Sequence, residues 1–151
     1  MRLPLLCDQV AGLRYIHVLR NGLDMAYSDN LNQLQWWGPS LGIDLPADTH
    51  ALPVAALRFW AVTTCRAVEV GRQRLGGRFL LLRLEDLCED PRAGCERLLR
   101  FLGEPADGAT ISRLSEIPVT PSSVGRHRQA DLNGFSEDDL DVVRQFGYAV
   151  P

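Results

Sequence analysis

The chain has 151 residues, 46% of them hydrophobic and 23% charged, which is typical of one globular domain with a sizeable core. Its net charge of −3 gives no reason to expect a nucleic-acid or anionic-membrane partner. All 16 basic residues are arginines, so chemistry that requires a lysine cannot come from this chain.

The first half of the chain predicts a strand between helices. Residues 3–11 are typical of a short helix, and residues 14–19, RYIHVL, predict a buried strand. Residues 22–36 predict a helix that ends before a Gly-Pro pair. The Gly, Pro and Asp content of residues 38–50 predicts a loop.

The second half predicts one strand and several helices. Residues 79–84, FLLLRL, are nearly all apolar, which is typical of a strand covered on both faces. Asp90 and Gly103 are suited to begin and end a helix, and Ser136 with Asp139 resembles a capping box. The other expected segments are helices over 52–75, 91–102, 108–117 and 136–146, and an irregular stretch over 118–134.

Two buried strands joined by helices indicate an α/β protein with a parallel sheet flanked by helices. We expect 14–19 and 79–84 to be neighbours or near neighbours in that sheet. Two strands are few for an open parallel sheet, so the pattern is typical of part of a larger α/β fold.

Arg20 and Ser28 lie on either side of the expected strand-to-helix turn. Ligands of open α/β sheets bind beyond the carboxyl ends of the strands, which is where Arg20 lies. An arginine and a hydroxyl beside a helix N-terminus suit a phosphate group. A helix cap beside a solvent-exposed arginine explains the same residues, and the pattern alone leaves both interpretations open.

The stretch YIHVLRNGLDMAYS, residues 15–28, resembles the 3′-phosphate-binding segment of sulfotransferases that use 3′-phosphoadenosine 5′-phosphosulfate (PAPS). In that family a strand ends in an arginine, and a serine follows eight residues later. Arg20 and Ser28 match both positions. Gly22 and Asp24 match too, whereas Asn21 and Leu23 depart from the usual Asp and Arg.

Three further blocks resemble the same family, in the same order, so that the resemblance covers about residues 14–149. The long helix carries Trp60. Residues 80–105 are similar to the block that contains Glu-Asp-Leu, Asp-Pro and Phe-Leu-Gly, with Leu84 in place of a tyrosine. SSVGRHRQ resembles a late Gly-Arg-Trp-Arg segment that closes over the cofactor, with His127 in place of the tryptophan.

The resemblance implies a partial P-loop-NTPase-like, sulfotransferase fold, formed by residues 1–151 as a single domain that is incomplete at its N-terminus. It implies that PAPS is the co-substrate, that Arg20, Ser28 and Arg126 hold its 3′-phosphate, and that a sulfuryl group moves to a hydroxyl or amine of an unidentified acceptor. No metal is implied.

The family's Gly/Ser/Thr-rich loop for the 5′-phosphosulfate is missing from this sequence, and no catalytic residue can be assigned. We therefore expect the chain alone to be inactive. It is a shortened sulfotransferase, one half of a split enzyme, or a non-catalytic nucleotide-binding or structural remnant. An oligomer or a complementing N-terminal half would cover its open sheet edge.

Other chemistry-bearing residues favour structural roles. His17 lies mid-strand and is expected to be a packed histidine, and His50 and His127 are expected at the surface of loops. Glu85 and Asp86 adjoin a strand end. The pair Trp36–Trp37 is expected to pack in the core more than to line an acceptor cleft.

The cysteines show neither C-x-x-C spacing nor a nearby histidine pair, so we expect no zinc or other metal site. The N-terminal apolar run is too short for a secretory signal, and no run of 18 apolar residues exists. These features favour a cytoplasmic protein with reduced cysteines and without a membrane span.

Overall fold

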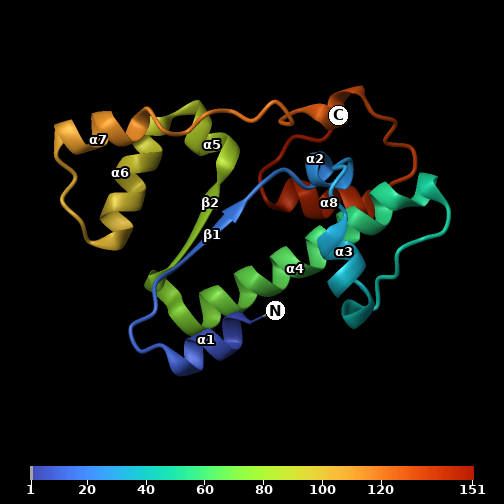
Figure 1. The fold of residues 1–151 in the computed structure, drawn as a ribbon, viewed down its shortest axis with the longest axis horizontal. Helices are drawn as coiled ribbons and strands as arrows, with labels where there is room; N and C mark the ends of the chain where they lie inside the picture. Colours follow the sequence, from blue (N-terminus) through green and yellow to red (C-terminus); the bar gives the residue numbers. More distant parts are fainter. Residues whose placement is uncertain (1) are drawn as a thin grey trace. The chain divides into compact units, whose positions relative to one another are not determined.

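The computed structural model describes residues 2–151 and is mixed α/β, mostly helical, with a small parallel sheet (Figure 1). The chain forms two compact units. One contains the residues up to 20 and residues 66–122, and the other contains 21–65 and 123–151. The single domain expected from the sequence stays a prediction, as does the P-loop-like arrangement.

The sheet of the first unit pairs β1 (Tyr15–Leu19) with β2 (Phe79–Arg83) in parallel, from Tyr15 opposite Phe79 to Leu19 opposite Arg83. The prediction that these two segments are parallel neighbours is confirmed. The prediction that 14–19 is a buried strand is wrong in part, because successive side chains point to opposite faces of a strand and β1 reaches the surface at Val18. Leu80 and Leu82 are buried, whereas Val18 on β1 is 54% exposed.

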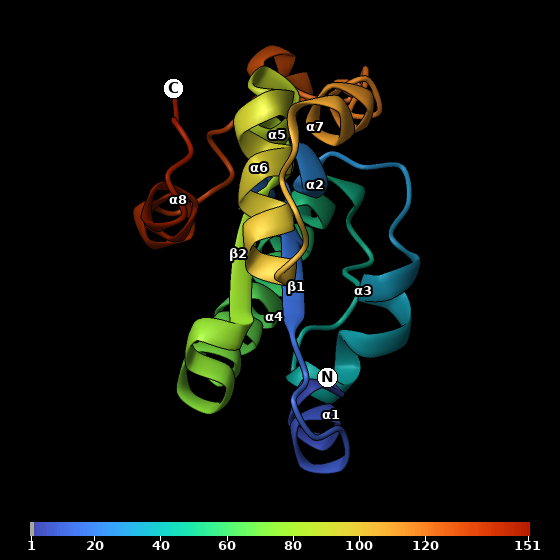
Figure 2. The same cartoon turned by 90° about the vertical axis from the view of Figure 1, so that its left-hand side faces the viewer.

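In the first unit α5 (Leu84–Glu89), α6 (Pro91–Leu102) and α7 (Gly108–Ser115) follow β2 along the chain, and α6 packs against both α5 and α7 (Figure 2). The carboxylate of Asp90 accepts a hydrogen bond from the Ala93 N–H at 2.9 Å, and Gly103 ends α6 at a φ of +80°, as their sequence positions predict. The helix α5 was not expected. The bounds are α1 (Leu3–Gln9), α5 (Leu84–Glu89), α6 (Pro91–Leu102), α7 (Gly108–Ser115) and the 3₁₀ turn η3 (Gly76–Arg78).

The second unit is built from short helices around one end of a long one. Its core includes Leu23, Leu57 and Val143, all fully buried. The capping box is confirmed, because Ser136 and Asp139 each accept a hydrogen bond from the other's backbone N–H. The bounds are α2 (Gly22–Ala26), α3 (Asn32–Trp37), α8 (Glu137–Gln145) and the 3₁₀ turns η1 (Pro39–Leu41), η2 (Thr49–Ala51) and η4 (Arg126–Gln129).

The long helix α4 (Leu52–Leu75) forms over the expected residues and contributes to both units, with the division between Cys65 and Arg66. The stretch Thr49–Arg78 is long and apolar enough to cross a membrane, judged by length and composition alone. Core helices of globular proteins pass the same test, so the absence of a membrane span stays a prediction.

Candidate functional site

The strand-to-helix turn expected at the end of β1 is present. Arg20 directly follows β1 and is half-buried. The next residue, Asn21, is buried and caps α2, because its side-chain oxygen accepts a hydrogen bond from the Leu23 N–H at 2.9 Å. Arg20 therefore stands at the carboxyl end of a parallel strand, as its place in the sequence predicts.

Ser28 is not on a helix, contrary to the prediction of one continuous helix over 22–36. The helix stops at Ala26, and the next one starts at Asn32. Between them, the Ser28 hydroxyl accepts from the Asn30 N–H at 3.3 Å, and the Asn30 side chain accepts from the Asn32 N–H at 3.1 Å. Such local bonds replace helical ones, which explains the break.

Residues 123–130, which we call the late loop, carry Arg126 to the segment that follows α2. The loop turns at Gly125, whose φ of +82° favours glycine, and continues into η4. The Arg126 guanidinium donates a hydrogen bond to the backbone oxygen of Tyr27 at 2.8 Å. Arg126 is thus held beside the residue that precedes Ser28.

The side chain of Asp24 on α2 ties the late loop in place. Its carboxylate accepts hydrogen bonds from the Gly125 N–H at 2.7 Å and the His127 N–H at 3.1 Å, and it lies 2.6 Å from Nδ1 of the His127 ring. We call Asp24, Gly125 and His127 the Asp24 clip. Burial acts to raise the pKa of Asp24, but these hydrogen bonds outweigh it and hold the pKa below its ordinary value.

His127 is buried, with 5% of its surface exposed, so the prediction of a surface loop histidine is wrong. The ring is buried because it packs against the Asp24 carboxylate in the clip. Since an ionised carboxylate can only accept hydrogen bonds, the Nδ1 nitrogen that faces Asp24 carries the hydrogen. Tyr27 contacts the residues that directly follow the late loop. Its hydroxyl donates a hydrogen bond to the backbone oxygen of Asp131, and its ring packs edge-to-face with the Phe135 ring at a centroid distance of 6.1 Å.

The structure thus brings two of the three predicted phosphate ligands, Ser28 and Arg126, to one place in the second unit. Arg20 is the last residue of the first unit, and its link to this group is its position one residue before Asn21. The sequence pattern did not assign a role to Asp24. The available signal was a carboxylate four residues after Arg20 among apolar neighbours.

Several other candidates occupy structural positions. His17 is half-buried on β1, its ring stacks on Tyr15 at a centroid distance of 6.2 Å, and burial lowers its pKa. Asp86 makes an ion pair with Arg83 at 3.0 Å. The prediction that Trp36 and Trp37 pack in the core is wrong, because they are 67% and 54% exposed.

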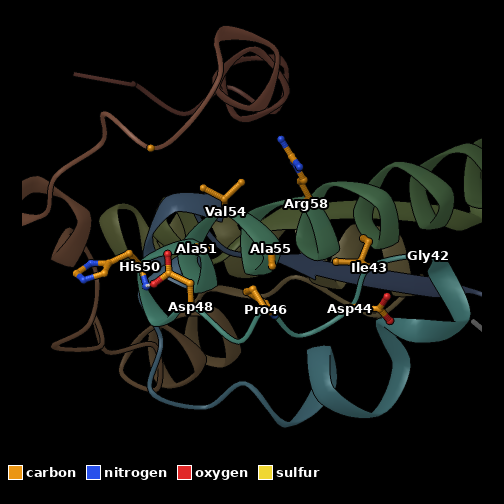
Figure 3. A pocket seen from close by; sticks show the side chains of 11 residues that line it. Gly42, Ile43, Asp44, Pro46, Asp48, His50, Ala51, Val54, Ala55 and Arg58 are labelled. Atoms are coloured by element: carbon orange, nitrogen blue, oxygen red, sulfur yellow. Dashed lines mark hydrogen bonds between the residues drawn. The ribbon is translucent and has the colours of Figure 1, made fainter.

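A hollow of about 580 Å³ lies between the loop that precedes α4 and the start of that helix, within the second unit. His50 and Asp48 lie at one end, and Ile43 and Asp44 at the other (Figure 3). Its lining residues are Gly42, Ile43, Asp44, Pro46, Asp48, His50, Ala51, Val54, Ala55, Arg58 and Gly134. None of the three predicted phosphate ligands belongs to it.

Among residues 2–151, no group of three or more His, Cys, Asp or Glu side chains is placed to hold a metal ion. No protein-family model, no curated protein and no solved structure matches the chain.

Proposed function

We propose that this chain binds the 3′-phosphate of PAPS, or of its product 3′-phosphoadenosine 5′-phosphate, as a sulfotransferase or the C-terminal portion of one. One observation supports the proposal most. The hydrogen bond from Arg126 to the Tyr27 backbone oxygen joins residues 99 positions apart and holds a guanidinium beside Ser28. Two segments that resemble the family separately therefore meet at this point.

The chemistry of the three side chains suits a phosphate with two or three terminal oxygens. Arginine is permanently charged and offers a planar fork of N–H donors, and a serine hydroxyl adds a short hydrogen bond. Arg20 would supply the main charged contact from the end of β1, and Arg126 would approach from the late loop. The Ser28 hydroxyl, whose oxygen accepts from the Asn30 N–H, would donate its own hydrogen to a phosphate oxygen.

The reaction of the family breaks the bond between sulfur and the bridging phosphate oxygen and joins the sulfuryl group to an acceptor oxygen or nitrogen, whose proton goes to a base. Catalysis of this kind depends on donors that neutralise the departing phosphate. The 151 residues contain neither a Gly/Ser/Thr-rich loop for that end of PAPS nor a lysine. A non-catalytic nucleotide-binding protein is the alternative.

We expect the purified 151-residue chain to transfer no sulfuryl group, because the groups that stabilise the leaving phosphate are missing. The measurement is release of 3′-phosphoadenosine 5′-phosphate from PAPS with a broad panel of phenols, alcohols and amines. A reaction without protein is the control. Turnover above that control would show that residues of this chain supply the missing stabilisation.

We expect the chain to bind 3′-phosphoadenosine 5′-phosphate, with an affinity near about 1 mM because only one end of the nucleotide is held, and to bind 5′-AMP more weakly. Loss of a charge-assisted contact costs about 1.5–3 kcal/mol, so Arg20→Ala should weaken the bisphosphate by about ten- to a hundredfold. Calorimetric titration of both nucleotides measures this.

Arg113→Ala is the matched control, since Arg113 is an exposed arginine on α7. It should leave both affinities unchanged. Equal binding of the two nucleotides by wild type, or no effect of Arg20→Ala, would show that Arg20 is only a strand-end arginine and that no phosphate site is present.

A further inference from the structure

The Asp24 clip fixes the residues on both sides of Arg126. Gly125 and His127 each donate a backbone N–H to the Asp24 carboxylate, at 2.7 and 3.1 Å. The carboxylate is almost inaccessible, with 1% of its side chain exposed. The backbone of Arg126 is therefore anchored at both neighbouring residues, and its side chain extends from that anchored turn to the Tyr27 backbone oxygen.

We propose that Asp24 is a positioning residue, which holds the late loop so that Arg126 lies beside Tyr27 and Ser28 and thereby sets the affinity for a 3′-phosphate. This inference rests on the proposed function of the same site. Asp24 does not contact the phosphate itself in this arrangement. Its carboxylate oxygens already accept the hydrogen bonds of Gly125 and His127, and Asp24 affects the ligand only by holding Arg126 in place.

The clip requires a group that accepts at both of its oxygens. One oxygen of Asp24 receives the Gly125 N–H, and the other receives the His127 N–H and the ring N–H of His127. An asparagine of the same shape has one oxygen and one NH₂ group. Whichever way its amide is turned, the NH₂ group faces at least one of these donors, so Asp24→Asn breaks the clip with little change of volume.

The test measures loop order and ligand affinity separately. Hydrogen exchange at the Gly125 and His127 amides, without nucleotide, reports the clip alone. Titrations of 3′-phosphoadenosine 5′-phosphate and 5′-AMP report the phosphate site. The matched control is Asp139→Asn, because Asp139 is also a hydrogen-bonded carboxylate of the second unit, paired with Arg58 at 3.1 Å and placed in the capping box of α8.

We expect Asp24→Asn to speed exchange by at least about tenfold at whichever of the two amides loses its acceptor, and to weaken the bisphosphate by about tenfold, with 5′-AMP unchanged, since one or two hydrogen bonds are lost. Asp139→Asn should change neither. If wild type prefers the bisphosphate and Asp24→Asn retains that affinity within twofold, the inference is overturned and the phosphate site stands. If wild type does not distinguish the nucleotides, the proposed function fails, and the role of Asp24 in binding fails with it.

Variants of His127 keep the test decisive if Asp24→Asn does not fold. Asparagine places an N–H close to the position of Nδ1, so His127→Asn should preserve the preference for the bisphosphate. His127→Leu removes the donor and should lower that preference severalfold while leaving the two backbone bonds to Asp24. Equal affinity of the two variants would exclude the ring bond from the positioning role.

Discussion

Asp24→Ala should lower the free energy of unfolding by about 3–5 kcal/mol, since it leaves two backbone N–H groups and a buried imidazole without their acceptor. Both N–H groups belong to the late loop, and His127 is 5% exposed. Denaturant titration measures the change. Asp29→Ala, an exposed aspartate five residues further on, should change stability by less than about 0.5 kcal/mol.

The stabilisation by Asp24 should depend on pH in a defined direction. Because the pKa of Asp24 is lowered from 3.8, the native state binds its proton less readily than the unfolded chain does. The contribution is therefore complete well above pH 3.8 and is lost as the pH is lowered from there through the depressed pKa of Asp24. Asp107 and Asp139 also have lowered pKa values, so the difference between wild type and Asp24→Ala must be followed. A difference that stays constant over this range would contradict an ionised, hydrogen-bonded Asp24.

Trp60→Ala should lower the free energy of unfolding by about 3–5 kcal/mol, the range for removing a large buried aromatic side chain. Trp60 is 8% exposed, and its ring meets the edge of Phe146 at a centroid distance of 5.6 Å. Its indole also lies directly on Gly22, where a Cβ atom would come within 2.6 Å of the ring. Trp36→Ala is the matched control, and because Trp36 is 67% exposed, its effect should stay within about 0.5 kcal/mol.

The contact between Trp60 and Gly22 gives a second measurement on the same variant. In wild type, Gly22→Ala should cost about 1–3 kcal/mol, because the methyl group must displace the indole. In the Trp60→Ala background the same substitution should cost nearly nothing, since the obstructing ring is gone. A double-mutant cycle measures this coupling, and strict additivity of the two effects would contradict the packing of Trp60 on Gly22.

Local chemistry explains which elements could be predicted from the sequence. Asp90 and Gly103 bound α6 because a carboxylate caps free N–H groups and glycine accepts a positive φ, and both effects depend on a few adjacent residues. The same holds for Ser136 and Asp139. The break after α2 had a local signal too, in the Ser-Asp-Asn run, but the apolar spacing on either side outweighed it.

The remaining features depend on residues far apart in the sequence. His127 is buried because a carboxylate 103 positions away receives it, and no neighbour in the chain indicates that partner. Trp36 and Trp37 are apolar enough for a core, yet their exposure is decided by which other elements pack near α3. The place of Arg126 beside Tyr27 could be expected only from the resemblance, because both sequence segments are irregular there.

The division of the chain into two discontinuous units has a consequence for the order of folding during synthesis. Every residue of the first unit has been made by position 122, whereas the second unit also needs residues 123–151. The first unit thus has all of its residues before the second unit does. Asp24 is made early but meets Gly125 only after 101 more residues, so closing this loop is a late, entropically costly step. Until residues 125–127 have been made, the Asp24 carboxylate lacks the donors through which it anchors the late loop.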